Sequence, residues 1–235
     1  DHLPVEVDDG PIRIKRLIEE ISQVFSFQMP QGSRQKQKGY AYLKIAVPLG
    51  EIQAQQLAEI GRIALQYGNG KVYFTPHQEI ELHWIPIRKI RQVMGKLKGI
   101  QLALKGGQNS VDVVACPGTE FCVLASANAQ GTARELLRHF KSDNPDRMAL
   151  FQSLSIHISG CPNGCAKHYL GDIGLSGEVG ADSDRYAYKL YLGGAVSAET
   201  RLGEVVCGGV TEEWIIPAID ALLAIVLEHR QLHET

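Results

Sequence analysis

The sequence lacks a long uninterrupted apolar run, an excess of basic residues and an even set of cysteines. Its longest apolar stretch, residues 215–227, is interrupted by Pro217 and Asp220, so we expect no contact with a membrane interior. The formal net charge of −2 provides no basic field for nucleic acid. Five clustered cysteines argue against a disulfide framework and for a reducing compartment, which predicts the cytoplasm, or the plastid stroma in a eukaryote.

The first part of the chain predicts a helix followed by a polar linker, together spanning residues 1–38. Apolar side chains recur at helical spacing over residues 11–25. The basic stretch 30–39 is typical of a solvated loop, and an anion-facing loop is the alternative.

Residues 39–106 predict a ferredoxin-like half-domain. The hydrophobic pattern switches between periods of two and about 3.6 residues. The expected strands and helices follow the order β-α-β-β-α-β, which is the ferredoxin-like arrangement. That order is a statement about fold alone. The strands are expected at 40–47, 71–75, 79–84 and 100–104, and the helices at 51–67 and 87–97.

Residues 107–235 predict a second, α/β module, so the chain as a whole belongs to the α+β class. A helix is expected after the Cys122 region, a loop at 141–146 and a closing helix at 212–229. Both pairs of cysteines come just after predicted strands, where α/β sheets place ligands. The strands are expected at 111–115, 154–159, 172–176 and 186–192.

Four of the cysteines form two closely spaced pairs. Cys116 and Cys122 lie in ACPGTEFC with C-x5-C spacing, and Cys161 and Cys165 lie in SGCPNGC with C-x3-C spacing. Four thiolates are the complete ligand set of one [4Fe–4S] cluster. Glycines in the second motif let its backbone approach a bound group closely.

Two other readings of the cysteines remain open. Zinc accepts C-x3-C spacing, but C-x5-C fits its short knuckles poorly. The four thiols are also compatible with inert or redox-active free cysteines, although the spacing favours an iron–sulfur site. Cys207 has no neighbouring partner and is predicted to be a packed core thiol. His157, within a predicted strand, is expected to be a satisfied core histidine.

Several motifs resemble the family of sulfite and nitrite reductases. The pattern S-G-C-P-N-G-C-x6-D-I-G-L at 159–175 resembles that family's sirohaem and [4Fe–4S] signature. Residues 115–125 resemble the matching first cysteine pair, nearest to the ferredoxin-dependent type. Residues 39–83 are similar to the family's ferredoxin-like half-domain, and 188–194 also fit. The resemblance covers about residues 39–230.

The resemblance implies that Cys116, Cys122, Cys161 and Cys165 bind a [4Fe–4S] cluster, and that Cys165 also lies against the iron of a sirohaem. It implies a six-electron reduction of sulfite to sulfide or of nitrite to ammonia. Ferredoxin or a similar donor would supply the electrons. In such a protein the cofactors carry the redox chemistry, while the polypeptide binds and orients them.

Further site residues follow from the same resemblance. Thr119, Asn163 and Gly164 are expected to contact cluster sulfur or a sirohaem carboxylate, although Asn163 is equally compatible with a cap on a tight turn. Thr75 and Gln78 fall on the family's T-x-R-Q element, which implies a place beside the sirohaem.

Basic residues near these motifs are candidates for the anion site. His77 takes the place of the arginine in T-x-R-Q, and its unperturbed pKa near 6.5 suits a proton donor or anion partner. A purely structural histidine is at least as compatible. Lys44 is a further catalytic candidate and Lys167 a cofactor-binding one. For these two, as for Lys105 and His168, a surface charge is the commoner role.

The familiar members of this family are about twice as long and consist of two related halves. This chain resembles the half that carries the cysteines, so we expect a homodimer or a second half-subunit. Two alternatives stay open, namely a related cobalamin-pathway iron–sulfur enzyme and a non-catalytic iron–sulfur subunit that carries electrons or binds partners.

Overall fold

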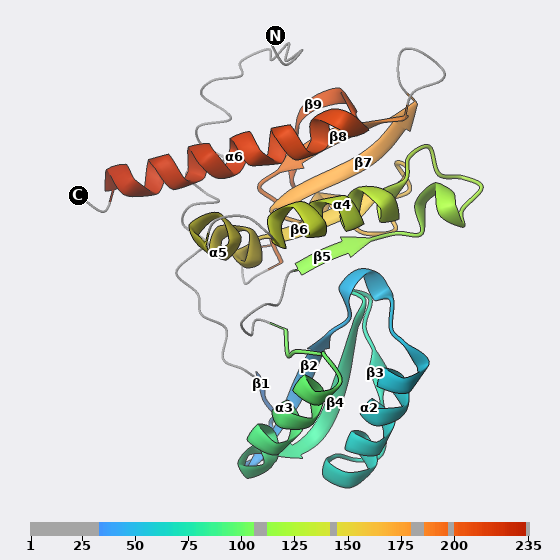
Figure 1. Cartoon of the computed structure of the whole chain (residues 1–235), viewed down its shortest axis with the longest axis vertical. Coiled ribbons are helices and arrows are strands. Elements are labelled where there is room, and N and C mark those ends of the chain that lie inside the picture. The colour runs from blue at the N-terminus through green and yellow to red at the C-terminus, as the bar shows by residue number, and fades with distance from the viewer. Residues whose placement is uncertain (1–32, 106–111, 142–144, 180–185, 197–199, 234–235) are drawn as a thin grey trace. The chain divides into compact units, whose positions relative to one another are not determined.

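The computed structural model describes residues 33–105, 112–141, 145–179, 186–196 and 200–233 (Figure 1). The described residues up to Asp112 form one compact unit, and those from Val113 onward form a second. The helix predicted at 11–25 lies outside the described residues. Within the described ranges, no helix is both long enough and apolar enough to cross a membrane.

The first unit contains a four-stranded sheet in the order β1-β2-β4-β3. Strand β4 is antiparallel to both β2 and β3, so β2 and β3 run in the same direction on either side of it. Helix α2 connects β2 to β3, which is the split β-α-β arrangement of a ferredoxin-like module. The elements are β1 Ser33–Arg34, β2 Tyr40–Ala46, α2 Ala54–Tyr67, β3 Tyr73–Phe74, β4 Glu79–Pro86 and α3 Ile90–Gly99.

The strand predicted at 100–104 is reduced to a single bridge between Leu104 and Ile45. The amide of Ala46 donates to the Ala103 carbonyl at 3.0 Å. Among the described residues, the pairing does not extend into a strand. The reason is that β1 pairs with Ala41 and Tyr42 on the same edge of β2. Only the far end of that edge remains for the returning chain.

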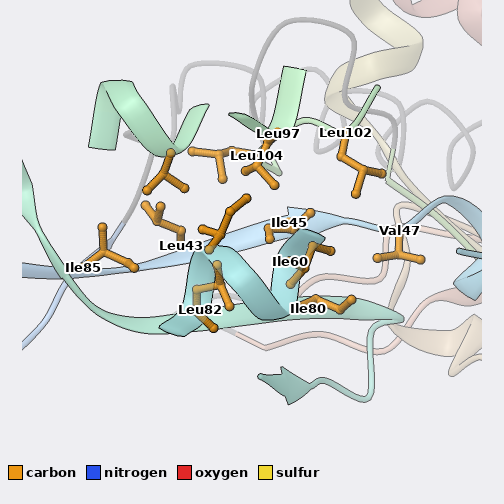
Figure 2. Close-up of a cluster of buried hydrophobic side chains, with 13 residues drawn as sticks. Leu43, Ile45, Val47, Ile60, Ile80, Leu82, Ile85, Leu97, Leu102 and Leu104 are labelled. Atoms are coloured by element: carbon orange, nitrogen blue, oxygen red, sulfur yellow. The ribbon is translucent and has the colours of Figure 1, made fainter. Parts of the chain in front are cut away.

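One hydrophobic core holds the first unit together, as Figure 2 shows. Alternation along β2 and β4 turns one face of the sheet toward α2 and α3. Each leucine or isoleucine fully buried there contributes about 1.5–3 kcal/mol. At the start of α2, Gln53 and Gln56 form a reciprocal capping box. The core includes Leu43, Ile45, Ile60, Ile63, Ile80, Leu82, Val93, Leu97, Leu102 and Leu104.

The second unit contains a five-stranded sheet in the order β5-β6-β7-β8-β9. Strands β6 and β7 are parallel, and β7, β8 and β9 are antiparallel neighbours. The sequence did not predict β9, which forms an edge of this sheet. The strands are β5 Asp112–Ala115, β6 Ser155–Ser159, β7 Ile173–Val179, β8 Tyr186–Leu192 and β9 Glu204–Thr211.

Cys207 lies in β9 and is half-buried, so the predicted full burial of this thiol in the core is wrong. An edge strand leaves its side chains partly open to water, which is the physical reason. Burial and the nearby Glu178 carboxylate still raise the pKa of the Cys207 thiol.

Three helices pack against one another in the second unit: α4 Ala129–Lys141, α5 Pro145–Ser153 and α6 Glu212–His233 (Figure 1). Helix α4 contacts β6, and α6 contacts β8 and β9. Helix α5 was not predicted, because its start falls in the stretch 141–146 that was expected to be a loop. The rings of Phe140 and Phe151 stack at 4.2 Å and join α4 to α5.

Candidate functional site

Both cysteine pairs follow strands of the second unit, as the sequence predicts. Strand β5 ends at Ala115, directly before Cys116, and β6 ends at Ser159, two residues before Cys161. The amide of Cys116 donates to the Ile158 carbonyl at 3.0 Å. The two loops therefore leave the sheet side by side.

Gly160 joins the two cysteine loops through its backbone. Its carbonyl accepts hydrogen bonds from the amides of Ser126 at 2.7 Å and Ala127 at 3.0 Å. Its own amide donates to the Cys116 sulfur at 3.0 Å. A Cβ atom at this position would lie 2.8 Å from the Ala127 carbonyl oxygen and 3.0 Å from Gly118 Cα. The close approach of the loops thus requires glycine here.

The first cysteine loop is a compact turn. The Cys122 amide donates to the Gly118 carbonyl at 2.9 Å, and the Thr119 amide donates to the Ala127 carbonyl at 3.2 Å. Thr119 is half-buried within this turn. A paired contact of the Glu120 carboxylate with an α4 arginine links the turn to the helix.

The second cysteine loop contains two residues in the left-handed backbone region. Gly164 has a φ of 69° and Lys167 has a φ of 56°. The Lys167 amide donates to the Gly164 carbonyl at 2.7 Å, which closes the turn. Asn163 and Cys165 are exposed on it.

The chemistry of the donors fits an iron–sulfur cluster, although the thiols are not gathered into a ligand cage. All five cysteines are free; Cys116 is buried, Cys122 and Cys161 are half-buried, and Cys165 is exposed. Among the described residues, no three histidine, cysteine, aspartate or glutamate side chains lie close enough to hold one metal ion. The donor set matches a [4Fe–4S] cluster in two respects. Four thiols lie on two hydrogen-bonded loops, and one backbone amide already donates to a cysteine sulfur.

Two histidines lie buried beneath the second loop. His157 is buried, and its Nδ1 lies 3.1 Å from the Lys167 carbonyl oxygen, which confirms a satisfied core histidine. His168 is also buried, so the expectation of a surface charge is wrong. Its burial, with a smaller effect of His157, lowers the pKa of His168, so the ring is neutral at pH 7. The motif spacing gave no signal of this burial.

The candidates Thr75, His77 and Gln78 form the tight turn between β3 and β4. The Thr75 hydroxyl oxygen accepts hydrogen bonds from the amides of His77 at 3.2 Å and Glu79 at 3.3 Å. Gln78 has a φ of 57°, which is uncommon for a residue with a side chain. His77 and Gln78 are half-buried at this turn.

Lys44 and Lys105 are ion-paired within the first unit. The Glu79 carboxylate, only 4% exposed, lies 3.7 Å from Lys44 Nζ and also contacts Lys105 Nζ. Lys105 Nζ lies 3.1 Å from the Asp112 carboxylate. Burial alone would lower the pKa of Lys105, but Asp112 and Glu79 outweigh it and raise that pKa. The sequence did not indicate the burial of Glu79, because the alternation along β4 places Glu79 on the face opposite the apolar residues, where a solvent-exposed side chain is expected.

We expect Glu79→Ala to destabilise the first unit by about 1–3 kcal/mol, because two lysines and the Thr75 turn lose a buried acceptor. Since the Lys105 pKa is raised from 10.5, the wild-type contribution is present below pH 10.5 and falls as the pH rises through the folded-state pKa. Chemical denaturation at pH 7 and pH 11 measures both. Glu81→Ala, a more exposed carboxylate, is the matched control, with an expected cost below about 1 kcal/mol.

Asp172, in the D-I-G-L motif, is a structural residue that sequence reasoning did not assign. Its Oδ2 accepts hydrogen bonds from the Ser155 amide at 2.8 Å and the Ser155 hydroxyl at 2.7 Å. The Ser155 hydroxyl oxygen accepts in turn from the Asp172 amide at 3.0 Å. This pair joins the starts of the parallel strands β6 and β7.

We expect Asp172→Ala to destabilise the second unit by about 1–3 kcal/mol, because the Ser155 amide is left without its acceptor. Thermal unfolding of the cofactor-free chain measures the change. Ser155→Ala keeps that amide bond and is expected to cost less, about 1 kcal/mol. Equal losses for the two variants would contradict this explanation.

The predicted site residues thus fall into two groups, each within its own unit. Thr119, Asn163, Gly164 and Lys167 lie with the four cysteines in the second unit. Lys44, Thr75, His77 and Gln78 lie in the first. Contacts of either group with a cofactor stay predictions.

Comparison with known proteins identifies both units. Residues 33–100 match the nitrite/sulfite reductase ferredoxin-like half domain, and residues 106–232 match the nitrite and sulphite reductase 4Fe-4S domain. The chloroplastic ferredoxin–nitrite reductase of Zea mays is 29% identical over 194 residues, covering 80% of this chain and 33% of that protein. Sulfite reductase [ferredoxin] 2 of Mycolicibacterium paratuberculosis is 29% identical over 179 residues, covering 73% of this chain and 32% of that protein.

A solved structure supports the fold. The Mycobacterium tuberculosis NirA protein superposes with a TM-score of 0.64 at 22% identity, covering 83% of this chain and 37% of that one. The chain spans about a third of the length of the curated relatives it matches. Because the 4Fe-4S domain model matches more than half of its residues and the half-domain model matches most of the remainder, the chain belongs to the nitrite and sulfite reductase family.

Proposed function

We propose that this chain is the cysteine-bearing half of a sirohaem- and [4Fe–4S]-dependent reductase. It would convert sulfite to sulfide or nitrite to ammonia with six electrons from ferredoxin or a similar donor. The observation that carries the proposal is the pair of cysteine loops joined at Gly160. They lie in the domain that matches the family's 4Fe-4S model, and the relatives are ferredoxin-dependent nitrite and sulfite reductases.

In this proposal Cys116, Cys122, Cys161 and Cys165 bind the cluster. When bound, the cluster and sirohaem supply the electrons and the iron at which the anion is reduced. The Gly160 amide, which already donates to the Cys116 sulfur, would keep this hydrogen bond to the sulfur when the cluster is bound. Thr119, Asn163, Gly164 and Lys167 bind cluster sulfur or the acidic edge of the sirohaem.

The first unit would contribute the remaining contacts. Thr75 and Gln78 bind the sirohaem, and His77 and Lys44 hold the anion or deliver protons. Glu79 supports this role because it contacts Lys44 and accepts the Thr75 hydroxyl hydrogen bond. Glu79 therefore holds the Lys44 and Thr75 side chains in place, and the Thr75 hydroxyl holds the backbone of the turn at His77.

A second copy of the chain or a different half-subunit would complete the reductase, in the cytoplasm or the plastid stroma. Two observations support this proposal of a missing half. The chain matches a half-domain of the family, and it spans only about a third of the length of the relatives. Phe121, Val123 and Leu124 flank Cys122 and are exposed, which suits a surface that a partner covers.

The test is anaerobic reconstitution with iron, sulfide and sirohaem. It is followed by a visible spectrum, iron and acid-labile sulfide analysis, and size-exclusion chromatography with light scattering. We expect sirohaem bands, about five irons per chain (four in the cluster and one in the sirohaem) with about four acid-labile sulfides, and a dimer, and then turnover of sulfite or nitrite with reduced ferredoxin. Four irons without sirohaem would instead support a non-catalytic electron carrier. Absence of bound iron would refute the proposal.

A further inference from the structure

His168 carries a buried nitrogen without a hydrogen-bond partner. The side chain is 4% exposed, and Nδ1 has no partner among the described residues. Folded proteins seldom leave a buried polar atom unpaired, because its lost hydration is not replaced. A buried nitrogen that stays unpaired therefore calls for a hydrogen-bond partner that this structure does not place beside it.

The ring edge with this nitrogen faces the second cysteine loop. A Cβ atom at Gly164 would lie 3.4 Å from His168 Cε1 and 3.7 Å from Nδ1. Gly164 directly precedes Cys165. The rings of Tyr169 and Tyr191 contact the imidazole with centroid distances of 5.3 and 4.7 Å, so its orientation is restricted.

The chemistry of the ring suits a hydrogen-bond donor. Burial lowers the pKa of His168, so at neutral pH the ring is uncharged and carries one N–H. The neighbouring His157 nitrogen is already bonded to the Lys167 carbonyl. The free nitrogen of His168 can donate to an anion without bringing a second charge into the buried region.

We propose that His168 Nδ1–H donates a hydrogen bond to a sulfur anion held at the second cysteine loop, either the Cys165 thiolate or an inorganic sulfide beside it. His168 is then a positioning residue that raises the reduction potential of the cluster. The inference rests on the proposed binding of a [4Fe–4S] cluster. Reduction adds negative charge to the sulfurs, so a donated hydrogen bond favours the reduced form.

Two nearly isosteric substitutions separate the donor from the volume of the side chain. His168→Asn places an amide N–H near the position of Nδ1, whereas His168→Leu has a similar shape and no donor. Tyr169→Phe is the matched control, since it keeps the ring beside Gly164 and removes only a hydroxyl. All three are made in the full chain.

The cofactor-free chain provides the first measurement. His168→Leu is expected to unfold at the same temperature as the wild type or higher, because it removes an unpaired polar atom. A large loss of stability in His168→Leu, absent from His168→Asn, would mean that Nδ1 already has a partner in the apoprotein. That result would overturn the proposal.

The reconstituted chain provides the second measurement, an electron paramagnetic resonance redox titration of the cluster. We expect His168→Leu to shift the one-electron equilibrium about tenfold toward the oxidised cluster, which is about 59 mV. His168→Asn should recover most of the shift, and Tyr169→Phe should show none. Equal potentials for wild type and His168→Leu, both with about four cluster irons, would refute this role of His168 and leave the proposed function intact. Failure of the wild type to bind iron would refute both.

Reconstitution with selenide in place of sulfide identifies the acceptor. If the acceptor is an inorganic sulfide, the difference in reduction potential between His168→Leu and wild type changes when selenide replaces sulfide. If it is the Cys165 thiolate, the difference is the same with either chalcogenide. Either result is consistent with the donor role.

Discussion

Cys165→Ser is expected to abolish reductase activity, the electronic coupling between sirohaem and cluster, and most of the bound iron. The serine hydroxyl is a harder, less acidic ligand than a thiol, and it stays protonated where a thiolate would form. Cys165 is exposed on its loop, so the substitution removes no buried contact and the chain should still fold. Iron and sulfide analysis after anaerobic reconstitution measures the effect, with the unfolding midpoint of the apoprotein as a check on folding.

Cys207→Ser is the control for this experiment. Cys207 lies in β9, within the same unit, and has no place in either cysteine loop. We expect it to leave the iron content and the visible spectrum unchanged. If Cys207→Ser removed the cluster while Cys165→Ser retained it, the assignment of the four ligands would be wrong.

The second large effect is expected for Gly177→Ala in β7. A Cβ atom there would lie 2.3 Å from the Gly160 carbonyl oxygen and 2.8 Å from Ala127 Cβ. That carbonyl accepts the two amide hydrogen bonds that join the cysteine loops, so it cannot move away without losing them. We expect a loss of about 3 kcal/mol or more in the second unit, together with weaker cluster binding.

Thermal unfolding of the apoprotein and iron content after reconstitution measure the two consequences of Gly177→Ala. Gly61→Ala in α2 is the comparison, because a Cβ atom there meets nothing within 4 Å. In a helix interior this change should stabilise by about 0.5–1 kcal/mol. A Gly177→Ala chain as stable as the wild type would show that the loops can separate at little cost.

Prediction from the sequence succeeded where the signal is local. Alternating apolar residues predicted β2 and β4, and helical periodicity predicted α2 and α6, with errors of a few residues at their ends. It failed where pairing between distant segments decides the outcome. The strand expected at 100–104 became one bridge because β1 occupies the other end of the same edge, and β9 and α5 were not predicted.

The candidate site shows the same division between local and distant information. The cysteine spacing and the glycines around Cys161 favoured an iron–sulfur site without reference to the fold, and the assignment of the four ligands stays a prediction. The buried carboxylate of Glu79 and the Asp172–Ser155 pair were not predicted, because each depends on a partner that is distant in sequence and lies close only in the folded chain. His168 was expected to be a surface charge, since a basic residue in a polar motif is usually solvated.

By itself, the sequence determined the α+β class, the two cysteine pairs and the family resemblance, since residue type, spacing and periodicity are properties of the chain alone. Only the tertiary structure decided that Gly160 joins the two loops and that His168 is buried with an unpaired nitrogen. The physical reason is that burial and hydrogen bonding depend on which segments lie in contact. The loops that meet at Gly160 are separated by more than thirty residues.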